Sequence, residues 1–443
     1  MGVADAPFGG AGLAKLHETS SLADSHRNSP PPQATTGNNC SALTMTRQNK
    51  PTNPGHSDEA YQDQILPHVS RTFALTIPQL PPDLSRSVTN AYLLCRVADT
   101  IEDEPQIAPP DTLLYMERFS DAVAGVADAQ ALGTELADKL SQWTLPAERE
   151  LIIHLARVIR VTRQLPLRQQ TAIRRCVDTM CHGMHQFQRT ASVRGLDTLE
   201  DLDSYCYYVA GVVGEMLTEL FCSHAPDIEQ HRAALSRLAP SFAQGLQMTN
   251  ILKDVWEDRS RGACWLPQEV FTRHGVDLAH LTAQTGGSGF AAGMHELVGV
   301  AHAHLRKALE FTLLIPARER GIRRFCLWAI GLAVLTLKRI AANPGFTEGS
   351  QVKVSRRTVA VTLALSNAAT RHNGLLRFLF NRAAVGLPLA CLAADWQPRK
   401  LQLTDDAGEL AASTYHRSRW VSTRDAQAEV GTLLRQPDRG TAQ

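Results

Sequence analysis

Asp99-Thr-Ile-Glu-Asp103 is the stretch that decides how this chain folds and works, and Asp254-Val-Trp-Glu-Asp258 repeats its pattern. In each stretch two aspartates stand four residues apart, so a helix would project both side chains from one face. If the two helices face each other, four carboxylates converge, and burial would drive some of them towards protonation unless cations neutralise them. Mg²⁺ does this and keeps coordination positions open for substrate phosphates. The repeat therefore predicts a magnesium-dependent enzyme that binds a diphosphate.

The residues around both stretches also follow helical spacing. Each segment has one polar stripe, which consists of Tyr92, Arg96, Asp99 and Asp103 in the first and Gln247, Asn250, Asp254 and Asp258 in the second. Their neighbours are apolar, as at Leu93, Leu94 and Ile251. A single Asp-x-x-x-Asp pair on a helix is usually solvated, but polar groups on an otherwise buried helix need partners. The two stripes therefore favour a binding site over a solvated face.

Four segments in a fixed order carry a resemblance to a known family. They are Ser70-Arg-Thr-Phe73, the segment from Tyr92 to Asp103, Tyr205-Cys-Tyr-Tyr-Val-Ala-Gly-Val-Val-Gly214, and the segment from Gln247 to Asp258. Together they resemble the squalene and phytoene synthase family, from about residue 60 to about residue 375. The resemblance implies an all-α fold, a single-domain helical bundle of the isoprenoid-synthase type around a central hydrophobic cavity. The two acidic motifs are expected at the mouth of that cavity.

The same resemblance implies roles for individual residues. Tyr205 is expected near the condensing carbons, as a proton acceptor or a cation stabiliser, and a buried phenol satisfied by a neighbouring acid is the alternative. The expected ligands of Mg²⁺, or of Mn²⁺ in its place, are Asp99, Glu102, Asp103, Asn250, Asp254 and Asp258. The expected substrate contacts are Ser70, Arg71, Phe73, Tyr92, Arg96, Val209, Gly211, Gln247 and Asn250. The expected NADPH contacts are Arg71, Asn250, Lys353 and Arg356, although Ser355 stands where a second basic residue is expected.

The implied reaction joins two farnesyl diphosphates head to head, forms presqualene diphosphate and reduces it with NADPH to squalene. Phytoene or dehydrosqualene synthase chemistry is the nearest alternative, because it shares the condensation and ends by proton loss. Tyr207 and Trp265-Leu-Pro267 favour that alternative, whereas Asp99-Thr-Ile-Glu-Asp103, Ser70-Arg-Thr-Phe73 and Lys353 favour squalene. An alternative of another class is a catalytically silent helical protein that binds isoprenoids. The intact acids of both motifs disfavour it.

The composition of the chain limits which other classes of function are possible. The 443 residues are 44% hydrophobic, which allows a large core, and the formal net charge of +1 gives no electrostatic case for nucleic-acid binding. The nine cysteines include no Cys-x-x-Cys pair and read as reduced thiols of a cytoplasmic protein. Gly286-Gly-Ser-Gly289 superficially fits a dinucleotide fingerprint, but no strand is predicted before it, so we expect a flexible loop.

The chain divides by composition into four parts. Residues 1–57 are rich in Gly, Ser, Pro, Asn and Thr and are predicted to be disordered, and residues 58–373 form the catalytic helical domain. Residues 374–395 are apolar but interrupted by arginines, which predicts an interfacial helix in peripheral contact with a membrane or an oligomer contact. Residues 396–443 form a polar mobile tail. The apolar runs are shorter than the about 20 residues of a membrane-spanning helix, so no transmembrane anchor is predicted.

Small residues in the segment after Tyr205 call for an explanation. Ala210, Gly211 and Gly214 fall within a stretch predicted as one helix from about residue 199 to 221. Glycine inside a helix costs about 0.5 to 1 kcal/mol relative to alanine, so its repeated use needs a reason. A prenyl chain lying against the exposed backbone would be one reason, and close packing of another helix would be a second.

Overall fold

The computed structural model describes residues 57–189, 191–283, 285–392, 396–398 and 400, and of Arg71 and Pro109 it describes only the backbone. The predicted disordered extension, residues 1–57, and the predicted mobile tail, residues 396–443, fall almost entirely outside these residues. Both stay predictions.

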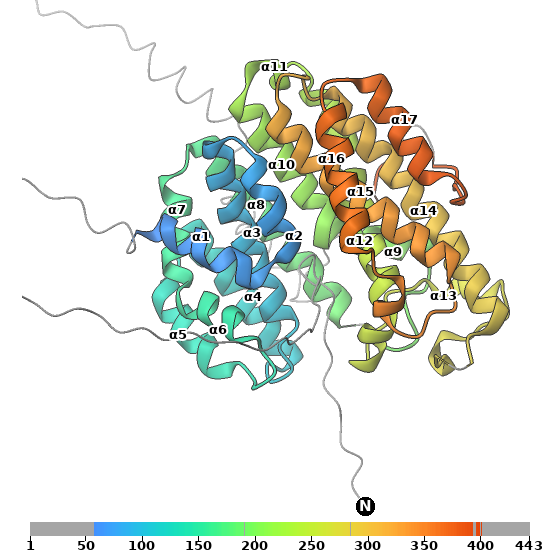
Figure 1. Cartoon of the computed structure of the whole chain (residues 1–443). Helices are drawn as coiled ribbons and strands as arrows, with labels where there is room; N and C mark the ends of the chain where they lie inside the picture. The colour runs from blue at the N-terminus through green and yellow to red at the C-terminus, as the bar shows by residue number, and fades with distance from the viewer. Residues whose placement is uncertain (1–56, 190, 284, 393–395, 399, 401–443) are drawn as a thin grey trace, which may run out of the picture. The chain divides into compact units, whose positions relative to one another are not determined.

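The described part of the chain is built from helices (Figure 1). Its only β pairing is an isolated bridge between Leu196 and Pro267. The α-helices are α1 Asp58–Val69, α2 Arg71–Thr76, α3 Pro82–Glu102, α4 Pro109–Ala124, α5 Ala129–Lys139, α6 Pro146–Ile153, α7 Leu155–Gln164, α8 Leu167–Gln188, α9 Leu199–Cys206, α10 Val212–His224, α11 Pro226–Glu229, α12 Arg232–Ser260, α13 Gln268–Thr272, α14 Gly287–Leu314, α15 Arg320–Ala342, α16 Arg356–Ala369 and α17 Asn373–Ala384. Shorter elements are η2 Ile77–Gln79, η3 Tyr207–Gly211, η4 Leu278–His280 and η5 Gly349–Val352. The predicted all-α fold is confirmed.

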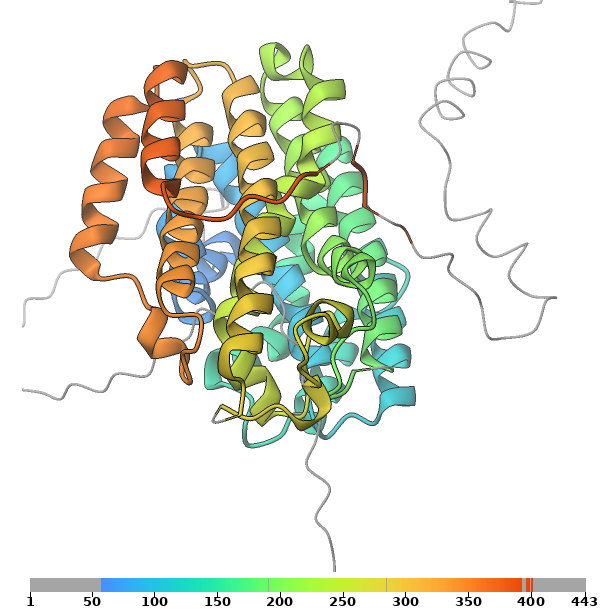
Figure 2. The same cartoon turned by 90° about the vertical axis from the view of Figure 1, so that its right-hand side faces the viewer.

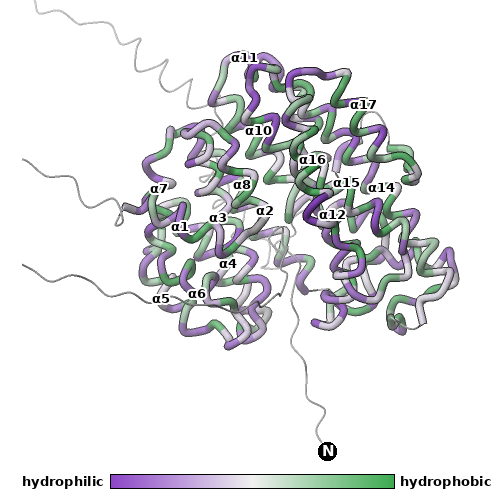
Figure 3. Tube along the Cα trace, viewed as in Figure 1, coloured by the Kyte–Doolittle hydropathy of each residue, from purple (hydrophilic) through white to green (hydrophobic). Residues whose placement is uncertain are grey.

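The two helices that carry the acidic motifs are both central. Helix α3 packs against α8, α1 and α7, and helix α12 packs against α14, α10 and α15. In Figures 1 and 2 the helices up to α8 lie on one side of this part of the chain and those from α12 onward on the other. Hydrophobic and hydrophilic residues interleave along the helices in Figure 3, as expected where one face of each helix is buried.

Residues 199–224 are helical throughout, as expected for 199–221, but η3 is a π-helical segment between α9 and α10. One local prediction is wrong. The expected flexible loop at Gly286–Gly289 is mostly helix, because α14 begins at Gly287. A Cβ on Gly289 would lie 2.5 Å from the carbonyl oxygen of His274, so the absence of a side chain there permits close packing.

One described helix, α15, is long and apolar enough to cross a membrane by length and composition. Of its most apolar 18-residue window, 56% is buried within the fold, where α15 contacts α14, α16 and α12. We therefore interpret α15 as a core helix. It also extends beyond the short apolar run, residues 325–337, that its sequence shows.

Candidate active site

The first acidic motif lies at the C-terminal end of α3. Asp99 and Glu102 are buried on its last turns, and Asp103 is the C-cap residue. Arg96 is buried one turn earlier, where it pairs with Glu148 of α6 and places its Nη1 atom 3.9 Å from Oδ2 of Asp99. A buried arginine with two carboxylate neighbours keeps positive charge under the motif. Sequence reasoning missed Glu148, because one glutamate in the first turn of another helix gives no pattern.

The second acidic motif lies within the continuous helix α12. Asp254 and Asp258 are buried, although Glu257 between them is exposed. The Nζ atom of Lys253 donates a hydrogen bond of 2.6 Å to Oδ1 of Asp254. Burial nevertheless raises the pKa of Asp254 to about 6, with Lys253 acting in the opposite direction. A divalent cation would relieve this penalty by favouring the ionised carboxylate.

Tyr205 lies near carboxylates of both acidic motifs. Its side chain is fully buried on α9, stacked on Trp265 with ring centroids 4.1 Å apart and with Phe187 at its edge. Burial raises the pKa of Tyr205 well above its usual value, and Glu102, Asp258 and Asp103 raise it further. Carboxylates of both motifs therefore act on one phenol. Glu102 and Asp103 of the first motif and Asp258 of the second thus lie near the same buried side chain.

Residues 70–73, which precede α3 in the chain, pack against α3 before the first acidic motif. Ser70 is the N-cap of α2, where its Oγ atom accepts a hydrogen bond of 3.0 Å from the backbone N–H of Phe73. The ring of Phe73 packs on Tyr92, with centroids 4.9 Å apart. The hydroxyl of Tyr92 donates to the carbonyl of Val69, and burial raises the pKa of Tyr92 to about 12. The side chain of Arg71 lies outside the described residues, so its predicted phosphate contact stays a prediction.

The remaining predicted substrate residues are buried beside α12. Val209 and Gly211 lie in η3 and Gln247 lies on α12. A Cβ on Gly211 would approach the ring of Tyr207 to 2.8 Å, and a Cβ on Gly214 would lie 2.1 Å from the carbonyl oxygen of Ala239. Close packing of another helix thus accounts for Gly214, whereas the near neighbour of Gly211 is a side chain of its own segment.

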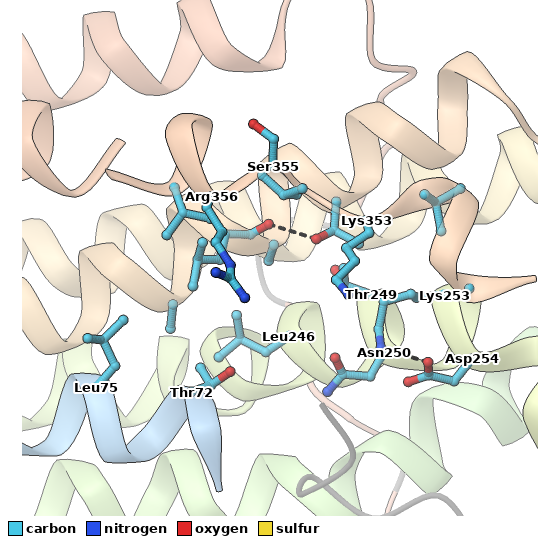
Figure 4. A pocket seen from close by; sticks show the side chains of 18 of the residues that line it. Thr72, Leu75, Leu246, Thr249, Asn250, Lys253, Asp254, Lys353, Ser355 and Arg356 are labelled. Atoms are coloured by element: carbon cyan, nitrogen blue, oxygen red, sulfur yellow. Dashed lines mark hydrogen bonds and ion pairs between the residues drawn. The ribbon is translucent and has the colours of Figure 1, made fainter. Parts of the chain in front are cut away.

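A cavity of about 860 Å³ borders the second motif (Figure 4). Its apolar wall includes Leu246, Leu332 and Leu363, from α12, α15 and α16. Its polar lining includes Asn250, Lys253, Asp254, Lys353 and Arg356, together with Thr72 and Thr249. In Figure 4, Arg356 and Lys353 extend towards α12 from the opposite wall. Asp99, Asp103 and Tyr205 do not line this cavity, so it adjoins one of the two motifs.

The donor atoms of the two motifs fit a magnesium ion whose ligands come partly from the protein and partly from the substrate. Within the ranges that the structure describes, no three His, Cys, Asp or Glu side chains are arranged to hold a metal by themselves. Mg²⁺ is usually bound by one or two carboxylates, completed by water and substrate phosphates, and not by a closed protein site. The two motifs offer only oxygen ligands, which is the chemistry that Mg²⁺ prefers.

The cavity also fits a phosphate-bearing cofactor. Three cations, Lys253, Lys353 and Arg356, line it together with the amide of Asn250. Its volume lies in the usual range of small-molecule sites, about 300 to 1,000 Å³. Sequence reasoning found Asn250, Lys353 and Arg356 but missed Lys253. Neighbouring residues on a helix do not normally face each other, so the pairing of Lys253 with Asp254 was not expected.

Comparisons with known proteins identify the family of this chain. The family model described as "Squalene/phytoene synthase" matches residues 66–358. The squalene synthase of Eremothecium gossypii is 27% identical over 311 residues, which cover 68% of this chain and 66% of that protein. The squalene synthase ERG9 of Candida albicans is 28% identical over 327 residues, which cover 70% of this chain and 68% of that protein. The chain thus spans about two thirds of the length of these relatives.

A solved structure supports the fold. The structure of TcSQS in complex with a ligand, BPH1237, superposes with a TM-score of 0.60 and covers 74% of this chain and 97% of that one. Sequence identity in this superposition is 24%, so the likeness concerns the arrangement of the helices.

Proposed function

We propose that this chain, which belongs to the squalene/phytoene synthase family, is a prenyl transferase of the squalene synthase type. The proposed reaction condenses two farnesyl diphosphates head to head into presqualene diphosphate, which is then reduced to squalene. The buried Tyr205, on which carboxylates of both acidic motifs act, is the observation that carries this proposal.

The acidic residues are proposed to hold the diphosphate end of the substrate. Asp99, Asp103, Asp254 and Asp258, with Glu102 and Asn250 beside them, are the proposed magnesium ligands. Bound Mg²⁺ would supply positive charge to the diphosphate leaving group as the carbon–oxygen bond breaks. Arg96, paired with Glu148, places positive charge beside Asp99. The contribution of this chain is therefore to pre-order carboxylates in a partly desolvated site.

Tyr205 is proposed to stabilise positive charge rather than to take a proton. Its raised pKa keeps the phenol protonated, which makes it a poor base. Its aromatic ring and that of Trp265 form an electron-rich surface beside the motifs, and aromatic faces attract cations. The surrounding buried side chains exclude water, and an allylic cation needs this protection because water would trap it.

The cavity beside the second motif is proposed as the NADPH site. Asn250, Lys353 and Arg356 would hold the cofactor, with Arg71 as a further predicted contact and Lys253 added by the structure. Bound NADPH would supply the hydride for the reductive half of the reaction. Arginine and lysine at the rim suit its phosphates, because both donate charge-assisted hydrogen bonds.

Product analysis tests this proposal. Purified protein is incubated with farnesyl diphosphate and Mg²⁺, with and without NADPH, and the lipids are extracted and identified. We expect squalene only when NADPH is present, and presqualene diphosphate to accumulate without it. A protein that consumes no prenyl diphosphate under either condition would contradict the proposal and favour a silent isoprenoid-binding protein.

One observation favours a second candidate, phytoene or dehydrosqualene synthase chemistry. Trp265, whose Trp-Leu-Pro context favours that product type, stacks directly on Tyr205. In this case the condensation is the same but proton loss ends the reaction. The incubations above separate the two candidates, because a product that is indifferent to NADPH supports this second one.

A further inference from the structure

The outer surface of α16 and α17, here called the α16–α17 face, is unusually apolar. Thirteen large hydrophobic side chains are exposed among the described residues, and six of them belong to this short part of the chain. They are Val361, Leu365, Leu375, Phe378, Val385 and Leu389, with Phe378 63% exposed. Single exposed hydrophobic residues are ordinary, but a cluster of this kind indicates an interaction surface.

The exposed side chains form stripes rather than a scatter. Val361 and Leu365 are one turn apart on α16, and Leu375, Phe378 and Arg382 follow helical spacing on α17. Leu376 and Phe380 of α17 are buried, so this helix has one face on the fold and another outside. Figures 1 and 2 agree that the two helices lie side by side at the outside of the bundle.

The charged residues of the segment that forms this face are all basic. Residues 349–394 contain one lysine and five arginines and no aspartate or glutamate. Arg377 is neutralised by a forked ion pair with Glu310 of α14. Arg371 and Arg382 are exposed, and Lys338 of α15 lies close by, where its Nζ atom donates to the carbonyl of Ala383. The apolar stripes are therefore accompanied by cations.

We propose that the α16–α17 face docks the protein on the surface of an anionic lipid bilayer. A helix with apolar residues beside arginines is suited to the boundary between headgroups and acyl chains, where the apolar side chains enter and the cations meet lipid phosphates. The absence of acidic side chains in residues 349–394 removes the repulsion that such a surface would otherwise meet. Leu375, Phe378 and Val385 enter the acyl boundary, and Arg371 and Arg382 contact the phosphates.

Docking in this orientation places the cavity beside the bilayer. Val359 and Leu363 of α16 line the cavity, whereas Val361 and Leu365 of the same helix are on the outside. Helix α16 is therefore the wall between the cavity and the lipid. This inference does not depend on the proposed reaction, because it rests on the charge and exposure of the outer side of α16 and α17.

Vesicle sedimentation of the full chain, without substrate, tests the docking. Vesicles of phosphatidylcholine alone are compared with vesicles that contain roughly one third phosphatidylglycerol. We expect binding to the anionic vesicles only, and its loss at about 0.5 M NaCl because salt screens the attraction. Reversing both exposed arginines, in Arg371→Glu/Arg382→Glu, should weaken binding more than 25-fold, at about five-fold for each cation removed.

The apolar part of the contact is tested by Phe378→Ser, with Trp143→Ser as the matched control. Phe378 is 63% and Trp143 is 77% exposed, and Trp143 lies between α5 and α6. Phe378→Ser should weaken binding about ten-fold, because most of an aromatic side chain is no longer buried in lipid. Trp143→Ser should bind as the parent does. Circular dichroism confirms that each variant is folded.

Three results would overturn the proposal. The first is an absence of binding to anionic vesicles by the parent chain. The second is equal weakening by Phe378→Ser and Trp143→Ser. The third is a dimer in sedimentation velocity that Phe378→Ser dissociates, since a second copy would then cover this face. Loss of catalytic activity has no bearing on these readouts, so a failed reaction and a failed docking surface are told apart.

Discussion

The two acidic motifs share the pattern Asp-x-x-Glu-Asp but occupy different environments. The first ends a helix, above a buried arginine, and its central Glu102 is buried. The second lies inside a longer helix at the edge of a cavity, beside a lysine, and its central Glu257 is exposed. Equal spacing therefore gives equal geometry along each helix but does not give equal electrostatics. The neighbouring elements determine whether a carboxylate is held by a fixed partner or can titrate.

The largest effect is expected from the paired substitutions Asp99→Asn and Asp254→Asn. If both motifs act on one diphosphate, each variant should lower kcat/KM by about 10² to 10³-fold, since each removes a ligand charge that the transition state needs. Steady-state kinetics with farnesyl diphosphate and Mg²⁺ measure the effect. The control Glu117→Gln removes an exposed carboxylate from α4 and should stay near the parent. A large loss in only one of the paired variants would show that the motifs do not share a substrate.

Removing the cation beside each motif, Arg96 or Lys253, is expected to lower the free energy of unfolding by different amounts. Arg96→Met removes a buried guanidinium and leaves Glu148 and Asp99 without it, so unfolding free energy should fall by about 3 kcal/mol. Lys253→Met should cost about 1 kcal/mol or less, because Lys253 lines the cavity and its loss exposes Asp254 to solvent there. Urea unfolding of both variants measures the difference. Equal losses would mean that the first motif is no more rigidly held than the second.

Gly214→Ala tests how the Tyr205 segment is held against the helix of the second motif. A methyl group would collide with the Ala239 backbone of α12, which cannot move like a flexible side chain, so a loss of about 2 kcal/mol is expected. The matched control is Gly345→Ala, because nothing lies within 4 Å of the Cβ position there. Thermal unfolding monitored by circular dichroism compares the two. If the two variants melt alike, α10 and α12 are less closely packed than described.

The smallest effect is a pH dependence that belongs to the second motif. The pKa of Asp254 is raised from 3.8 to about 6, so between about pH 4 and pH 6 the folded protein holds a proton that the unfolded chain has released. This group therefore costs stability as the pH rises through that window, and the cost is complete above pH 6. In EDTA, Asp254→Asn should be more stable than the parent by about 1 to 2 kcal/mol at pH 7.

That advantage should shrink towards zero near pH 4, where Asp254 is protonated in both folded and unfolded chains. Denaturant titrations at several pH values follow the difference between variant and parent, which cancels the titration of other groups. If the stability of Asp254→Asn relative to the parent instead rose as the pH fell, the pKa of Asp254 would be lowered in the folded protein. Folding would then stabilise the charged form of Asp254.

Sequence reasoning reached the all-α fold and the helices of both motifs because their polar stripes and apolar neighbours repeat at helical spacing. It predicted Asn250, Lys353 and Arg356 together, and the structure places all three around one cavity. It could not find Glu148, whose relation to Arg96 exists only after α3 and α6 pack. It also could not tell that the two motifs have different partners. Tertiary neighbours decide such properties, and a helical pattern contains no information about them.

The π-helical segment η3 has a consequence for how this chain is aligned with others. Each residue turns a helix by about 100°, so one surplus residue in a π turn rotates everything after it relative to everything before. A helical wheel drawn straight through residues 199–224 therefore misassigns the faces of α10. A relative without this surplus residue would show a one-position gap inside a helix rather than in a loop. Equivalent positions beyond Gly211 are best assigned from the contact between Gly214 and Ala239.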